Sequence, residues 1–168
     1  GRGGTEEKDV VLAIARRVAE EINAAPGMRA VLTRNGDYFI PLRRRTELAH
    51  QAQADFFMSI HADSYRERDA SGATVYVLSD KGASDEQSLW LAQRENASDL
   101  IGGVSLADKD PLVARVLLDL SQSAALSAST SAGQRLIRRM SGVTSMRRPQ
   151  VQQAPFLVLK SPDIPSVL

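Results

Sequence analysis

His61 is the residue of this chain whose type and position most favour chemistry. It follows the apolar run at residues 56–60, which is too short for an ordinary helix and comes directly after a helical pattern. Such a run is typical of a parallel strand covered on both faces, and open α/β sheets bind ligands beyond the carboxyl ends of their strands. Asp63 and Ser64 follow at once, so we expect a site for catalysis or binding here. The alternative is a structural histidine that caps the strand end.

Glu7 is the candidate partner of His61, and His50 is the other of the two histidines of the chain. Glu7 opens the first expected helix, where an acid also interacts favourably with the helix dipole by about 0.3–1 kcal/mol. On spacing alone, that structural role is favoured. His50 lies on a predicted helix and points away from its apolar face, so we expect a solvated surface position. The sequence has no P-loop, no G-x-S-x-G elbow and no H-E-x-x-H motif, so these residues indicate a His/Glu site without specifying its reaction.

Composition excludes several classes of protein. The 168 residues fit one domain, with 43% hydrophobic and 24% charged residues. Lys and Arg total 21 against 20 Asp and Glu, and no basic stripe is interleaved with aromatics, so no nucleic-acid partner is expected. The absence of cysteine excludes disulfides, thiolate metal sites and cysteine nucleophiles. No apolar stretch approaches the roughly 20 residues that span a bilayer, so no membrane insertion is expected.

Helical and strand patterns alternate along the first half of the chain. The first helix has Thr5 as its cap and ends at Pro26, and Pro41 opens the second. The expected elements, in order, are this first helix, a strand at 29–33, a helix at about 41–53, the strand at 56–60 and a strand at 72–78. This order predicts an α/β fold whose mostly parallel sheet has helices on both faces.

The second half is more helical. A capping box of Ser84 and Gln87 predicts a helix over residues 84–101, whose apolar residues form no single stripe and so face more than one element. A second long helix is expected from Asp110 toward Ile137, with a linker over residues 121–133 as the alternative reading. The predicted final strand covers residues 156–160, and another strand-like run begins at 165–168.

Six short motifs spread over the chain resemble one enzyme family. They are EKDVVL at 7–12, LTR at 32–34, SIHADS at 59–64, ENASDLIGGV at 95–104, LDLSQ at 118–122 and VLKSPDIPSVL at 158–168. In this order they resemble the catalytic domain of the zinc-dependent N-acetylmuramoyl-L-alanine amidases that split daughter cells in Gram-negative bacteria. The resemblance covers essentially the whole chain.

The resemblance implies a zinc site and a reaction. Members of the family hold zinc with two histidines and a glutamate and hydrolyse the amide between N-acetylmuramic acid and L-alanine of peptidoglycan. Glu7 and His61 match two of the ligands. The third ligand, a histidine, is expected upstream of Gly1 and the general-base glutamate just after Leu168. The chain is therefore expected to lack the first strand and the end of the last, and to be inactive alone.

The resemblance also implies regulation. Residues 1–168 correspond to one partial catalytic domain, and residues 82–108 to a helical regulatory insertion within it. Glu95 is expected to occupy the open position of the zinc until activator proteins that resemble degenerate endopeptidases displace it. Export to the periplasm is expected. Met146 stands where relatives commonly have histidine and is read as a core or rim residue.

Two other functions remain as alternatives. One is a non-catalytic domain with an amidase-like fold that binds peptidoglycan or a partner protein. The retention of Glu7 and His61 argues against it, because a decayed site need not keep its ligands. The other is an intracellular α/β hydrolase of different specificity, which only the generic fold favours.

Overall fold

The structure is a computed structural model of the chain, and it describes all residues except 1–3, 5, 63–70, 80, 102–114 and 162. The chain divides into two compact units. The first comprises Gly1–Ile40 and Ile60–Ala70, and the second comprises Pro41–Ser59 and Ser71–Leu168. Within the described residues, no helix is both long and apolar enough to cross a membrane.

The first unit contains helix α1 (Glu7–Ala24), which ends one residue before the Ala25–Pro26 step because a residue before proline disfavours the helical conformation. The predicted cap, Thr5, lies outside the described residues, and Glu6 takes the cap position without a side-chain hydrogen bond.

The predicted strand at residues 29–33 is wrong. The described residues there belong to neither a strand nor a helix. Its Ala30 N–H donates to the Asn23 side chain at 2.8 Å, and Val31 is 59% exposed. The segment is therefore anchored to α1 by a side chain instead of by a neighbouring strand.

Two parallel strand pairs form the sheet of the second unit. β1 (Phe57–Met58) pairs with β4 (Ser166–Val167), and β2 (Tyr76–Leu78) pairs with β3 (Gln152–Ala154). The backbone groups of Tyr76 and Leu168 exchange hydrogen bonds of 2.7 and 3.0 Å, which joins the two pairs. Because such reciprocal exchange marks antiparallel neighbours, the spatial order is β1-β4-β2-β3 with one antiparallel junction.

Side chains of this sheet alternate between two hydrophobic clusters. In one cluster, Tyr76 packs edge to face against Phe156, with their ring centroids 5.3 Å apart. Val75 and Val77 join Ile137 in the other cluster. Because successive strand residues point to opposite faces, the clusters lie on opposite sides of the sheet. The predicted α/β fold with helices on both faces is thus confirmed for the second unit.

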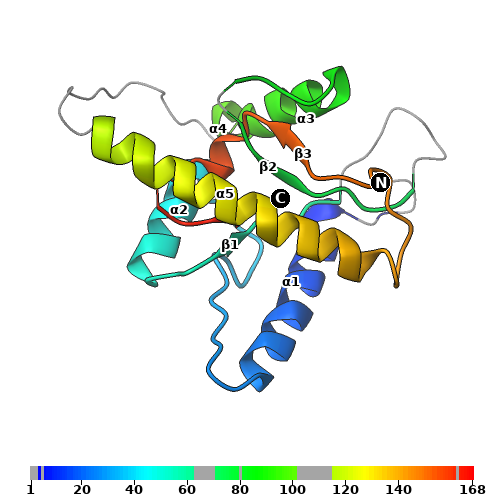
Figure 1. Cartoon of the computed structure of the whole chain (residues 1–168). Helices are drawn as coiled ribbons and strands as arrows, with labels where there is room; N and C mark the ends of the chain where they lie inside the picture. The colour runs from blue at the N-terminus through cyan, green and yellow to red at the C-terminus, as the bar shows by residue number, and fades with distance from the viewer. Residues whose placement is uncertain (1–3, 5, 63–70, 80, 102–114, 162) are drawn as a thin grey trace. The chain divides into compact units, whose positions relative to one another are not determined.

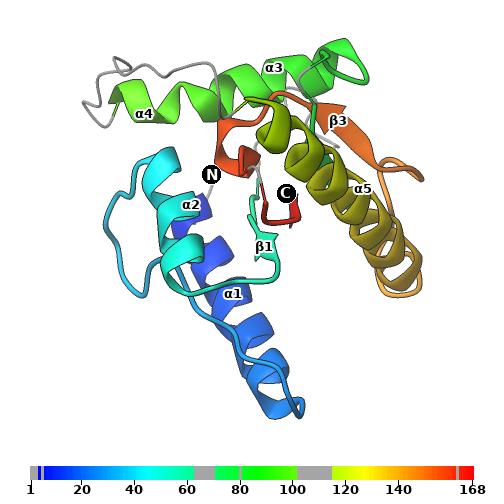
Figure 2. The same ribbon diagram turned by 60° about the vertical axis from the view of Figure 1, so that its left-hand side comes forward.

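Helix α5 (Arg115–Met140) packs along β2 and β4 on one face (Figure 1). On the other side lie α2 (Leu42–Gln51), α3 (Glu86–Asn96) and the short 3-10 turn η2 (Leu157–Leu159). α4 (Ser98–Ile101) follows α3 directly, as Figure 2 shows. α5 is helical through residues 121–133, so the linker alternative is wrong.

Three local predictions in the second unit are corrected. The cap of α3 is Asp85 instead of Ser84, and its carboxylate accepts the Ser88 N–H at 2.7 Å. This bond lowers the pKa of Asp85. The Ser84 hydroxyl accepts the Gln153 N–H instead. Residues 157–159 form η2 instead of a strand. β1 covers only Phe57–Met58 of the predicted strand at 56–60. It is also less covered than predicted, since Met58 is 37% exposed.

The described chain also contains a strand that its sequence does not suggest. Gln152 and Gln153 of β3 are polar and show no apolar alternation, so their pairing is set by β2 and not by local preference. Their backbone groups form the hydrogen bonds to β2. Phe156, two residues beyond the end of β3, contributes a fully buried side chain.

We expect Gly72→Ala to destabilise the protein by about 2–4 kcal/mol. Gly72 has φ +99°, and an added Cβ would lie 2.7 Å from the Ser145 carbonyl oxygen. Gly82→Ala is the matched control, because Gly82 has φ +120° but no atom within 4 Å of the added Cβ, so we expect a loss of only about 1 kcal/mol. Urea denaturation of both variants measures the difference. Equal losses would contradict a steric role for Ser145.

Candidate active site

The described structure brings Glu7 and His61 together within the first unit. Glu7 is the first residue of α1. His61 follows β1 by three residues, and between them the Ser59 N–H donates to the Val167 carbonyl at 2.9 Å. His61 is therefore two residues beyond the last residue of this segment that bonds to β4, and Glu7 lies at the start of a helix.

One carboxylate oxygen connects the two segments. Oε1 of Glu7 accepts the Ala62 backbone N–H at 2.9 Å and lies 3.3 Å from His61 Nδ1. The His61 side chain is 14% exposed and that of Glu7 is 35% exposed. The acid thus reaches across 54 residues of sequence to a largely buried imidazole and is oriented by the backbone next to it.

A network of charged residues holds the first turn of α1. The Lys8 ammonium contacts Asp37 at 2.7 Å and Glu6 at 2.9 Å, and the hydrogen bond to Asp37 is the main cause that raises the pKa of Lys8. Arg34 donates to the carbonyls of Lys8 and Gly36 at 2.6 and 2.9 Å. Lys8 and Arg34, which lie in the EKDVVL and LTR motifs, therefore both hold the start of α1.

The Glu7–His61 pair fits two ligands of a zinc ion. Ligand atoms about 2.0–2.2 Å from a tetrahedral zinc are roughly 3.3–3.5 Å apart, and the Oε1–Nδ1 distance is 3.3 Å. The bond from the Ala62 N–H to Glu7 is of the kind that orients carboxylates at metal sites. No group of three or more His, Asp or Glu residues capable of holding a metal occurs in the described part of the chain.

His50 is at the surface, as predicted, but it is not merely solvated. Its side chain is 41% exposed, and its Nε2 lies 2.6 Å from Asp163 Oδ1. Nδ1 faces the Thr46 carbonyl at 2.9 Å. Sequence reasoning missed this contact because 113 residues separate the two partners.

Glu95 lies in α3 of the second unit and is half-buried. Its neighbour Asn96 donates to the Pro155 carbonyl and accepts the Leu157 N–H, both at 2.8 Å. Asp99 of α4 is 5% exposed and accepts the Leu42 N–H at the start of α2. Sequence reasoning assigned no role to these two residues, although Asn and Asp often satisfy backbone groups at such positions.

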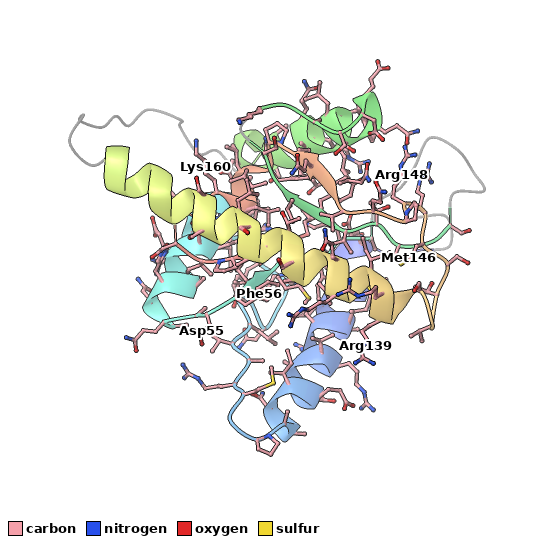
Figure 3. All side chains as sticks on the ribbon, viewed as in Figure 1. Asp55, Phe56, Arg139, Met146, Arg148 and Lys160 are labelled. Atoms are coloured by element: carbon pink, nitrogen blue, oxygen red, sulfur yellow. The ribbon has the colours of Figure 1, made fainter. Side chains whose placement is uncertain are left out.

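Met146 packs against the cluster of Val75, Val77 and Ile137, beside the last turns of α5 (Figure 3). It also forms an isolated parallel bridge with Ala73. The reading of Met146 as a core or rim residue is confirmed.

The fold and the pair of candidate ligands define an α/β protein with a polar site beyond the carboxyl end of a strand. The chain belongs to the N-acetylmuramoyl-L-alanine amidase family, whose profile matches residues 1–168. It is 45% identical to the N-acetylmuramoyl-L-alanine amidases AmiA and AmiC of Escherichia coli over its whole length. It spans 58% of the length of AmiA and 40% of that of AmiC.

Solved structures support the same fold. The amidase AmiC2 of Nostoc punctiforme superposes with a TM-score of 0.60 at 28% identity, over 100% of this chain and 67% of that one. The catalytic domain of CwlV from Bacillus (Paenibacillus) polymyxa gives a TM-score of 0.55 at 20% identity, over 98% of this chain and 66% of that one.

We expect Asn96→Ala to destabilise the protein by about 1–3 kcal/mol, because it leaves the Pro155 carbonyl and the Leu157 N–H without the amide. Ser98→Ala is the nearby control. The Ser98 hydroxyl is buried and has no hydrogen-bond partner among the residues that the structure describes, so its removal is expected to be neutral or slightly stabilising. Thermal denaturation of both variants distinguishes them, and a loss at Ser98 as large as that at Asn96 would contradict this account.

Proposed function

We propose that the full-length protein is a zinc-dependent peptidoglycan amidase. It hydrolyses the amide between N-acetylmuramic acid and the L-alanine of the stem peptide, acts in the periplasm and contributes to septal wall splitting. The observation that carries the proposal is the 3.3 Å contact of Glu7 and His61, two residues that the family motifs single out from opposite ends of a 54-residue stretch. The 45% identity to proteins named as amidases supports the same reaction.

Each residue of the pair has a defined task. Glu7 and His61 supply one oxygen and one nitrogen ligand, and the Ala62 N–H fixes which carboxylate oxygen faces the imidazole. The burial of the His61 side chain, which is 14% exposed, limits its rotation. When bound at such a site, zinc lowers the pKa of a water to about 7 and polarises the substrate carbonyl. The third ligand and the general base are not assigned to residues 1–168.

A metal and activity measurement tests this proposal on the full-length gene product. We expect about one zinc per chain and release of dye from labelled peptidoglycan. His61→Ala is expected to lower zinc content and to reduce hydrolysis by at least about 100-fold, because a ligand is lost. Arg17→Gln, which alters only exposed ion pairs on α1, is the control and is expected to retain both. Zinc binding and hydrolysis unchanged in His61→Ala would refute the assignment.

Glu95 is proposed as the regulatory residue, held in place by α3. Support comes from the adjacent Asn96, whose two hydrogen bonds fix the end of α3 against residues 155–157. Activator proteins that resemble degenerate endopeptidases are the proposed partners that release it.

We expect Glu95→Ala to raise basal peptidoglycan hydrolysis of the full-length protein. The gain is about tenfold if displacing the Glu95 side chain costs the wild type about 1.4 kcal/mol. Glu86→Ala is the matched control, because Glu86 is an exposed acid at the start of the same helix. Dye-release assays compare both with the wild type. A gain of the same size in Glu86→Ala, or none in Glu95→Ala, would remove Glu95 from the proposal.

The competing function is a domain that binds peptidoglycan or a partner without catalysis. It predicts a full-length protein that sediments with purified peptidoglycan but contains no zinc and releases no dye. That combination would replace the amidase proposal.

A further inference from the structure

The contact between His50 and Asp163 connects the two segments that lead into the β1–β4 ladder. His50 lies in the last turn of α2, which is followed by β1 at Phe57. Asp163 lies two residues before Pro165, whose carbonyl accepts the Phe57 N–H at 2.9 Å. The side-chain contact therefore joins the chain just before β1 to the chain just before β4.

The surroundings of the imidazole favour its protonated form. Nε2 of His50 lies 2.6 Å from the Asp163 carboxylate, and Nδ1 lies 2.9 Å from the Thr46 carbonyl oxygen. Both neighbours are acceptors, and a neutral imidazole carries only one N–H. Only the imidazolium can donate to both, so loss of its proton leaves one of the two contacts unmade.

The carboxylate has a second donor that keeps it in place. Ser161 Oγ donates to the same Asp163 oxygen at 3.2 Å. Asp163 is therefore oriented by its own loop before it meets His50.

Other charged groups near the contact of His50 and Asp163 either have an ion-pair partner or lie elsewhere on the neighbouring elements. Glu47 contacts Arg44 at 3.0 Å and Arg43 at 3.7 Å. The charged groups of the elements packed here are Arg43, Arg44, Arg45 and Glu47 on α2, Lys160 and Asp163 on the segment that follows η2, and Asp99 at the opposite end of α2. Asp163 is the carboxylate that contacts the imidazole.

We propose that His50 and Asp163 form a pH-dependent clasp that positions β1 against β4, and with β1 the strand end that leads to His61. His50 and Asp163 are positioning residues in this proposal, and neither belongs to the Glu7–His61 pair. The clasp deepens the proposed function, and its kinetic part rests on that function.

The direction of the pH dependence follows from the two groups. The bond to Asp163 raises the pKa of His50. The contribution of His50 to the stability of the folded protein is therefore complete below its ordinary pKa of about 6.5 and is lost as pH rises through the raised value. The bond to His50 lowers the pKa of Asp163, so its contribution is present above about 3.9 and is lost as pH falls through the lowered value. The clasp is therefore complete between about pH 4 and 6.5.

Thermal denaturation of the full-length protein at pH 5.5 and 8.5 tests the clasp. His50→Gln keeps a neutral donor without a titrating ring, and Asp163→Asn removes the carboxylate charge. We expect each variant to melt about 1–3 °C below the wild type at pH 5.5, with less than half of that difference at pH 8.5. Arg43→Gln, which breaks an ion pair on the same helix, is expected to show the same difference at both pH values.

The kinetic arm measures peptidoglycan hydrolysis by the same variants. We expect the kcat of His50→Gln relative to wild type to fall about 3–10-fold at pH 5.5 and to approach 1 at pH 8.5. Melting differences that do not depend on pH would overturn the clasp. A pH-dependent melting difference with an unchanged kcat ratio would overturn its positioning role. Inert wild-type protein would instead refute the amidase function, while the melting data still decide on the clasp.

Discussion

The reciprocal hydrogen bonds between Tyr76 and Leu168 are the connection on which the second unit depends. Each of the two parallel ladders has only two or three residues per strand, and an isolated pair of this length is marginally stable in water. Joining them lets α5 cover one continuous face, and lets α2, α3 and η2 cover the other. Because neighbouring residues of a strand point to opposite faces, Tyr76 packs in one cluster and Val77 in the other.

The α/β class, the end of α1 before Pro26 and the start of α2 after Pro41 were predictable because local chemistry decides them. Pro26 and Pro41 restrict the backbone around them regardless of tertiary context, and apolar periodicity identified α1 and α2. The strand at residues 152–154 and the turn at 157–159 were not predictable. Gln152 joins β2 through backbone groups that every residue possesses, and Val158 is buried by neighbours distant in sequence.

The candidate site shows the same division. His61 was singled out by its residue type and its place after an apolar run, whereas Glu7 was singled out only by motif, since spacing alone favoured a helix-stabilising role for it. That role also holds, because Glu7 and Asp9 are the acids of the first turn of α1. The Ala62 N–H that orients the carboxylate is a backbone group and leaves no signature in the residue type. Asp163 likewise contacts His50 only because the fold closes a gap of 113 residues.

The backbone on both sides of Met146 is held by hydrogen bonds, in addition to the packing of its side chain. The Ala73 N–H donates to the Ser145 carbonyl at 2.9 Å, and the Arg147 N–H donates back to the Ala73 carbonyl at 2.8 Å. Neither bond involves the side chain at position 146. A residue of different chemistry there would keep both backbone bonds but would lose the packing of Met146 against the cluster of Val75, Val77 and Ile137.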